Sequence, residues 1–207
     1  MVQRVIRQLG ESDLKGHVTV ATSLSQADVI YNQLGEYIDV VVEPERRDTF
    51  PAIALAASYL KYEKSCADEE VVVVMPCDPF TEAGYFKVIE QMVHAVDVAE
   101  LVLMGITPTY PSVKYGYVVP DESKLKGGIF SVKRFTEKPN VATAEYLIKE
   151  NAFWNGGVFA FKLGYMMNIM EQYIRAVSFS EIRNRYSEFP KISFDYEVAE
   201  KAKLVAV

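Results

Sequence analysis

The sequence is poor in the residues that build disulfide frameworks, metal clusters and nucleic-acid-binding surfaces. Its 207 residues include only two cysteines and two histidines, and the net charge is −6 with no basic run. Two cysteines give neither a disulfide framework nor a metal-type Cys pair, which fits reduced thiols in a cytoplasmic protein. An acidic chain without a basic stripe argues against nucleic acid or an anionic membrane as a general partner.

Long apolar runs are also missing. No stretch is long enough to span a bilayer, and the opening MVQRVIRQLG has no apolar central segment, so it is not a signal peptide. What is present is a 24% charged fraction beside 50% apolar residues. This composition predicts a folded protein with a substantial core, and the length suits one α/β domain.

Strand-like and helix-like apolar patterns alternate along the chain. The expected strands are 17–22, 38–44, 71–76, 101–107 and 154–162, with an antiparallel pair at 115–120 and 128–139 around a polar loop. The expected helices are 1–10, 23–35, 50–64, 81–99, 141–151, 163–177 and 195–203.

The run VVVVM at 71–75 is apolar throughout, which indicates a strand buried on both faces, as in parallel sheets. We therefore predict a three-layer, Rossmann-like α/β fold with a mostly parallel (mixed) central sheet. Strands near 38–43, 71–75 and 101–107 should lie inside that sheet.

A single acid, Asp78, follows this apolar run. In open α/β sheets, ligands bind beyond the carboxyl ends of the strands, and Mg²⁺ bound to substrate phosphates uses one or two carboxylates. The same position also suits a helix N-cap, because DPFTEAGYF leads into a helix. Position alone leaves both interpretations open.

Other clusters pair polar residues with element ends. EPERRDTFPAI (43–53) precedes a helix whose free N–H groups can meet an anion, although a capped helix with solvated arginines is the favoured interpretation of this cluster by itself. Gly116 in KYGYVVP lets a ligand approach the backbone, or marks a bulge. Glu137 and Lys138 in FTEKP suit hydroxyls and phosphate, and Asn155 in WNGG suits hydroxyls, although each is by itself ordinary at a surface or turn.

The order of these clusters is more specific than any one of them. Together EPERRDTFPAIALAA, VVVVMPCDPF, GITPTYPSVKYGYV, FTEKP, FWNGGVFAF and ISFDYEVAEK resemble the sugar-1-phosphate nucleotidylyltransferases, and most of all the mannose-1-phosphate guanylyltransferases. The resemblance implies formation of GDP-mannose and pyrophosphate from GTP and mannose 1-phosphate, with Mg²⁺ as cofactor. The resemblance implies that Asp78 binds Mg²⁺ and that Asp78 and Lys138 are catalytic. It implies that the sugar phosphate is bound by Gly116, Glu137, Lys138 and Asn155. It also implies that the nucleotide is bound by Arg47, Asp48 and Thr49.

Two parts of that family's pattern are not found in the 207 residues. One is the first strand with its Gly-rich loop, which cradles the triphosphate, and the other is a later aspartate segment. We expect a single nucleotidyltransferase domain over 1–207 that lacks these parts and is catalytically silent by itself. The same reaction with another sugar or base, or a non-catalytic sugar-phosphate- or nucleotide-binding protein, stays an alternative, and a homodimer is compatible with either.

Overall fold

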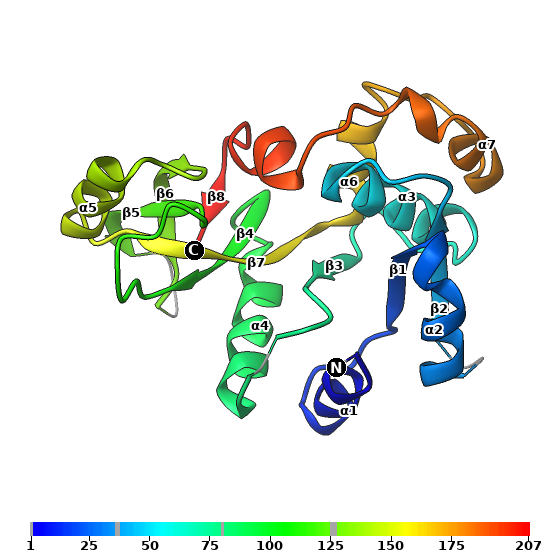
Figure 1. Cartoon of the computed structure of the whole chain (residues 1–207), viewed down its shortest axis with the longest axis horizontal. Helices are drawn as coiled ribbons and strands as arrows, with labels where there is room; N and C mark the ends of the chain where they lie inside the picture. Colours follow the sequence, from blue (N-terminus) through cyan, green and yellow to red (C-terminus); the bar gives the residue numbers. More distant parts are fainter. Residues whose placement is uncertain (1, 36–37, 80, 125–127) are drawn as a thin grey trace. The chain divides into compact units, whose positions relative to one another are not determined.

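The computed structural model describes residues 2–35, 38–79, 81–124 and 128–207 (Figure 1). The chain divides into two compact units, each assembled from three separate segments. Unit 1 comprises Met1–Glu70, Cys77–Phe86 and Lys162–Phe194, and unit 2 comprises Val71–Pro76, Lys87–Phe161 and Asp195–Val207. The single nucleotidyltransferase domain over 1–207 stays a prediction.

Unit 1 contains a two-stranded sheet and several helices. Strands β1 (Thr19–Ser23) and β2 (Asp39–Glu43) run parallel and are connected through α2 (Leu24–Leu34). Gly35 ends α2 at φ 70°, where its N–H donates to the carbonyl of Tyr31. The remaining elements are α1 (Val2–Glu11), α3 (Thr49–Tyr62), α6 (Leu163–Met170), α7 (Phe179–Asn184) and the 3-10 helix η2 (Tyr186–Glu188).

Helix α3 carries much of the core of unit 1. Its Phe50 and Leu55 are fully buried, and the helix packs against α6 and α7. The ring of Phe50 meets those of Tyr173 and Phe189 edge-on, at centroid distances of 5.4 and 5.9 Å. Pro51 lies in the first turn of the helix, where a missing N–H breaks no helical hydrogen bond.

Unit 2 contains a six-stranded sheet in the order β3-β7-β4-β8-β6-β5. Strand β5 also pairs with β7, so every strand of this sheet except β3 belongs to a closed circuit of pairings. Helix α4 (Ala83–Ala95) leads into unit 2, which also holds α5 (Val141–Lys149) and the π-helix η3 (Asp195–Ala199). The strands are β3 (Val71–Val74), β4 (Leu101–Ile106), β5 (Tyr117–Lys124), β6 (Phe130–Thr136), β7 (Phe153–Lys162) and β8 (Val205–Ala206).

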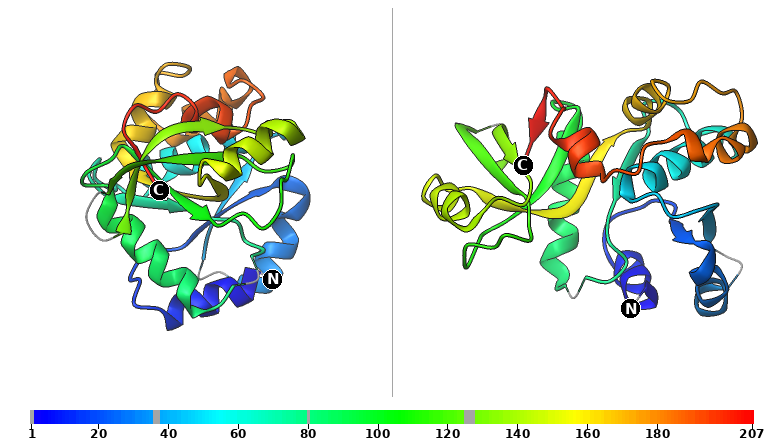
Figure 2. Two further views of the ribbon diagram at one scale, coloured as in Figure 1. Left: turned by 90° about the vertical axis from the view of Figure 1, so that its left-hand side faces the viewer. Right: turned by 45° about the horizontal axis from the view of Figure 1, so that its top comes forward.

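Helix α5 lies beside β5 (Figure 2). Its Ala144 and Leu147 share a buried cluster with Tyr117 and Trp154. Tyr117 is the first residue of β5, and Trp154 is the second residue of β7. Asn140 caps the helix, since its side chain accepts the N–H of Thr143 at 2.8 Å. This packing holds the beginnings of both strands against a helix.

The α/β fold class is confirmed, and the 115–137 segment is antiparallel as expected, with Tyr117 opposite Thr136. The prediction that parallel pairing dominates is wrong for the pairings whose direction the structure gives. Pairs β1–β2 and β4–β8 are parallel, whereas β4–β7, β5–β6, β5–β7 and β6–β8 are antiparallel.

The position predicted for strand 71–75 is also wrong. Among the described strands β3 stands at the end of the order, and its four valines are only partly buried. Strand β2 belongs to the two-stranded sheet, so only β4, of the three strands expected inside, has a neighbour on each side. An apolar side-chain pattern indicates that the faces of a strand are buried. The neighbouring strands pair along its edges through backbone hydrogen bonds, so the side-chain pattern does not show how many neighbours the strand has.

The helix expected over 195–203 is instead the π-helix η3. The N–H of Glu200 donates to the carbonyl of Asp195 at 2.9 Å, an i→i+5 bond, where an α-helix would make i→i+4 bonds. The polar loop expected between the antiparallel strands is shorter, because β5 reaches Lys124, and its residues 125–127 lie outside the described residues.

Candidate functional site

The candidate site lies at one end of three neighbouring strands of unit 2. Tyr117, the first residue of β5, is opposite both Thr136 of β6 and Trp154 of β7. The next row of this end of the sheet consists of Gly116, which precedes β5, Glu137, which follows β6, and Asn155 of β7. Gly116 lies between the other two, and its carbonyl accepts the N–H of Asn155 at 2.8 Å. Since opposite residues of antiparallel strands share a face, these positions face the same side.

Gly116 is buried, and its missing side chain is what allows the close approach. A Cβ atom at this position would collide with Oε2 of Glu137 and would lie 3.0 Å from Cζ of Phe135 and 3.4 Å from Cβ of Asn155. The register of β5 shifts only after Val119, so Gly116 is not a bulge glycine. The glycine therefore makes room beside the carboxylate.

The loop before Gly116 is held by a buried tyrosine. The hydroxyl of Tyr117 accepts the N–H of Ser112 at 2.8 Å and donates to the carbonyl of the same residue at 3.0 Å. Tyr117 is fully buried. The backbone on both sides of the glycine is thus fixed.

Glu137 carries a buried carboxylate with one oxygen unpaired. Its side chain is 6% exposed, and Oε1 lies 3.1 Å from Nζ of Lys138. The other oxygen, Oε2, is buried and has no hydrogen-bond partner among the described residues. Burial raises the pKa of Glu137, the charges of Asp195 and Glu200 act in the same direction, and Lys138 opposes them. An unpaired buried acceptor is costly, so this oxygen is suited to a donor brought by a ligand.

Lys138 presents its charge to the solvent beside this buried carboxylate. Its backbone has φ 43°, a left-handed conformation that costs free energy for a residue other than glycine and is frequent at functional sites. Its side chain is 53% exposed, and hydrogen bonding to Glu137 raises the pKa of its ammonium. The ammonium is therefore charged at neutral pH and available to an anion.

Asn155 has its side-chain amide fixed at both ends. Nδ2 donates to Oδ1 of Asp195 at 2.5 Å, and Oδ1 accepts the N–H of Gly157 at 3.1 Å. The N–H of Glu137 in turn donates to Oε1 of Glu200 at 3.3 Å. The roles of Asp195 and Glu200 were missed by sequence reasoning. The acids of ISFDYEVAEK were the available signal, but nothing local pairs them with residues forty or more positions away.

The aromatic residues of this region pack on the other side of β7. Side chains alternate along a strand, so Trp154 points away from the face that carries Asn155. The rings of Tyr110 and Tyr115 lie 5.0 and 5.1 Å from that of Trp154, centroid to centroid. These rings therefore pack on the face of β7 opposite to Asn155.

The residues expected near the nucleotide lie in unit 1, before α3. Arg47 is 15% exposed and donates to Oε1 of Glu45 at 2.8 Å and to the carbonyl of Phe189 at 2.7 Å. Asp48 has φ 73° and caps α3 by accepting the N–H of Thr49 at 2.7 Å. Oγ1 of Thr49 accepts the N–H of Phe194 at 2.8 Å.

These contacts give the three residues a structural task in unit 1. Arg47 and Thr49 hold the loop between β2 and α3 against the segment that follows η2, and Asp48 caps α3. The helix-cap interpretation therefore applies to Asp48, whereas the contact with a nucleotide stays a prediction for Arg47, Asp48 and Thr49.

Asp78 is exposed and lies four positions after the last residue of β3. The N-cap interpretation does not hold, because α4 begins only at Ala83. Among the described residues, no group of three or more His, Cys, Asp or Glu side chains could hold a metal. The role of Asp78 toward Mg²⁺ stays a prediction, in which its carboxylate acts together with phosphate oxygens, a mode that Mg²⁺ commonly uses.

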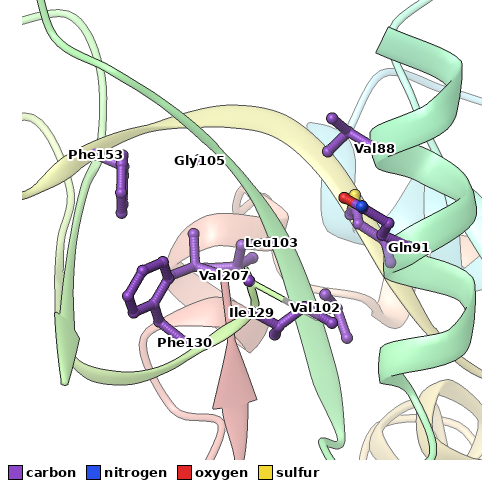
Figure 3. A pocket seen from close by; sticks show the side chains of 11 residues that line it. Val88, Gln91, Val102, Leu103, Gly105, Ile129, Phe130, Phe153 and Val207 are labelled. Carbon is purple, nitrogen blue, oxygen red and sulfur yellow. The ribbon is translucent and has the colours of Figure 1, made fainter. Parts of the chain in front are cut away.

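A separate hollow of about 160 Å³ lies within unit 2, between α4 and the strands (Figure 3). Val88 and Gln91 of α4 line it, opposite Leu103, Phe130 and Val207. Among the described lining residues Gln91 brings the only polar side chain, and none of these side chains is charged. The described lining of this hollow is therefore apolar apart from Gln91, and it shares no residue with the site around Gly116, Glu137 and Asn155. No helix of the described part of the chain is long and apolar enough to cross a membrane.

The chain is similar to a known protein family and to several curated proteins. The family model described as "Nucleotidyl transferase" matches residues 1–187. A putative mannose-1-phosphate guanylyltransferase of Vibrio cholerae is 31% identical over 192 residues, which is 84% of this chain and 40% of that protein. A mannose-1-phosphate guanylyltransferase of Escherichia coli is 27% identical over 98% of this chain and 49% of its own length. The chain thus spans about half or less of these relatives.

Solved structures agree on the fold. A Thermus thermophilus protein, titled "mannose-1-phosphate geranyltransferase", has a TM-score of 0.83 and 26% identity, covering 100% of this chain and 62% of that one. A Helicobacter pylori protein, titled mannose-6-phosphate isomerase, has a TM-score of 0.75 at 17% identity, covering 99% and 86%. A UDP-glucose pyrophosphorylase from Acinetobacter has a TM-score of 0.63 at 15% identity, covering 99% and 73%. The last two share the fold alone.

Proposed function

Because the chain belongs to the nucleotidyl transferase family, we propose that it serves the formation of GDP-mannose and pyrophosphate from mannose 1-phosphate and GTP. The observation that carries the proposal is the buried, unpaired Oε2 of Glu137 beside the exposed ammonium of Lys138. A sugar hydroxyl would donate to that oxygen, and the 1-phosphate would pair with the ammonium. The names of the curated relatives support mannose as the sugar and guanosine as the nucleoside.

In the proposed reaction a phosphate oxygen of mannose 1-phosphate attacks the α-phosphorus of GTP. The new P–O bond forms as the bond to the bridging oxygen of pyrophosphate breaks. Such transfers depend on positioning and electrostatic stabilisation more than on covalent chemistry by the protein. The amide of Asn155 and the carboxylate of Glu137 orient the sugar, the backbone at Gly116 lets it approach, and Lys138 aligns the attacking phosphate.

Replacing Lys138 by alanine tests the phosphate half of this site. We expect the affinity of the 207-residue chain for mannose 1-phosphate to fall about tenfold, the order of one hydrogen bond between charged groups. Affinity for mannose itself should stay within about twofold. Isothermal calorimetry measures both, and Lys133→Ala, which removes an exposed lysine from β6, is the matched control. Equal weakening for mannose and its phosphate would show that Lys138 does not meet the phosphate.

Asp78 is the residue that we propose to hold Mg²⁺ together with the nucleotide phosphates. When bound, the ion would offset the charge of the phosphates. Asp78→Asn should lower the affinity for Mg²⁺–GTP about tenfold and leave that for GTP in EDTA unchanged. Calorimetry with Asp28→Asn as an exposed control in unit 1 measures this. A loss of affinity that is the same with and without Mg²⁺ would place Asp78 at the nucleotide rather than at the ion.

The alternative substrates are separated by the same method. Glucose 1-phosphate and UTP, titrated beside mannose 1-phosphate and GTP, show which sugar and base the chain prefers. Preference for glucose 1-phosphate would move the proposal to another member of the family. The cytoplasmic location and the homodimer stay predictions.

A further inference from the structure

We infer that Asp195, the first residue of the π-helix η3, and Glu200, which directly follows η3, are positioning residues that set Asn155 and Glu137 for the sugar. The inference rests on the proposed function, since it concerns the same pocket. Neither acid contacts the sugar in the proposed reaction.

Asp195 fixes the orientation of the Asn155 amide. An amide can rotate by half a turn and exchange its oxygen for its nitrogen at nearly the same shape. Here Nδ2 donates to Oδ1 of Asp195 at 2.5 Å, while Oδ1 accepts the N–H of Gly157 at 3.1 Å. The flipped amide would face the carboxylate with its oxygen and the Gly157 N–H with its nitrogen. Only one orientation is therefore stable, and it leaves the second Nδ2 proton for a ligand.

Glu200 acts on the neighbouring strand end. Its Oε1 accepts the backbone N–H of Glu137 at 3.3 Å, just where β6 ends and the chain turns into the left-handed Lys138. This bond holds the backbone from which the buried carboxylate projects. It is longer than the bond of Asp195 to Asn155, so we expect the smaller effect from Glu200.

The π-helical turn allows the side chains of Asp195 and Glu200 to point toward the same site. In an α-helix each residue advances about 100°, so side chains five positions apart diverge widely. The i→i+5 bond from the N–H of Glu200 to the carbonyl of Asp195 closes a wider turn. Residues five apart then lie closer to one face, and their carboxylates reach Asn155 and the N–H of Glu137. Single π-turns of this kind occur frequently at functional sites.

The test is calorimetry of mannose 1-phosphate with a set of Asp195 variants. Asp195→Leu keeps the approximate size and removes the acceptor, and we expect about tenfold weaker binding. Asp195→Asn keeps an acceptor oxygen and should restore binding to within about threefold of the original chain. Lys201→Ala is the control, because it breaks the ion pair with Glu197, which lies inside η3, without touching Asn155.

A double-mutant cycle separates positioning from a general structural effect. If Asp195 acts through Asn155, adding Asp195→Leu to Asn155→Ala should change binding no further. An additional tenfold loss in that background, or unchanged binding by Asp195→Leu alone, would overturn the inference while leaving the proposed function standing.

A second measurement does not depend on the sugar. In ¹⁵N spectra the side-chain amide of Asn155 should show slowed proton exchange in the original chain and in Asp195→Asn, and fast exchange in Asp195→Leu. Absence of mannose 1-phosphate binding by the original chain, together with this exchange pattern, would reject the proposed function but keep Asp195 as the residue that orients Asn155. Fast exchange in the original chain would reject the positioning role itself.

Discussion

Glu137→Gln is expected to abolish most binding of mannose 1-phosphate while making the fold more stable at neutral pH. The variant replaces a buried charged acceptor by a neutral one and removes the negative charge that pairs with Lys138. Hydrogen bonds to charged groups contribute about 1.5–3 kcal/mol, so affinity should fall about ten- to hundredfold. Calorimetry measures the loss, and Glu145→Gln on the exposed side of α5 is the control.

The stability effect follows from the direction of the pKa shift. Burial raises the pKa of Glu137 above its ordinary value. The folded state therefore favours the protonated carboxyl, so its contribution to stability is present in acid and is lost as pH rises through the folded-state pKa. At pH 7 the buried charge is a cost that glutamine does not carry. Each kcal/mol relieved should raise the melting temperature by about 2–4 °C for a chain of this length.

The pH dependence provides the decisive comparison. The difference in melting temperature between Glu137→Gln and the original chain should be positive at pH 7 and shrink toward pH 4, where the glutamate itself is protonated in the folded state. Calorimetric melts at both values measure it. A variant that is less stable than the original chain at pH 7 would show that the ion pair with Lys138 outweighs the cost of burial.

Gly116→Ala is expected to disrupt the same site through a different cause. The added Cβ would collide with Oε2 of Glu137 and press on Phe135 and Asn155. Overpacking of this kind typically costs about 1–3 kcal/mol, and here the group displaced is the carboxylate proposed to hold the sugar. Both the melting temperature and the affinity for mannose 1-phosphate should therefore fall, the affinity by at least about tenfold.

Gly84→Ala is the matched control for this substitution. Nothing lies within 4 Å of a Cβ at Gly84 in α4, and alanine is favoured over glycine in a helix by about 1 kcal/mol. That variant should be as stable as the original chain or more so, with unchanged binding. If Gly116→Ala behaved in the same way, the close approach of Glu137 to the glycine would not matter for the site.

Local patterns predicted the elements and part of the site. Gly35 marked the end of α2, and Pro51 marked the start of α3 to within two residues. Gly116 and Asn155 were each expected near the beginning of a strand and Glu137 at the end of one, and the antiparallel pairing of β5 with β6 and β7 brings the three together. Strand ends are readable because turn residues and polar groups interrupt apolar runs.

Partners distant in sequence could not be read in this way. The edge position of β3 depends on which strands pair with it, and its valines are compatible with either place. Asp195 and Glu200 reach Asn155 and Glu137 only because a π-helical turn places them there. Whether a segment adopts an i→i+4 or an i→i+5 bond is decided by packing, and DYEVA contains no residue that specifies it.

The closed circuit of pairings in unit 2 has a consequence for the order of folding. Strand β8 stands between β4 and β6, with Val205 opposite Leu101 and Ala206 opposite Ser131. These contacts join residues far apart in the chain, and such distant closures form slowly because ordering the intervening loop costs entropy. During synthesis the ring cannot close before Ala206 has emerged from the ribosome. Until then β8 is not available to pair with β4 and β6. During this time the unpaired edges of β4 and β6 are open to chaperones or to other strands.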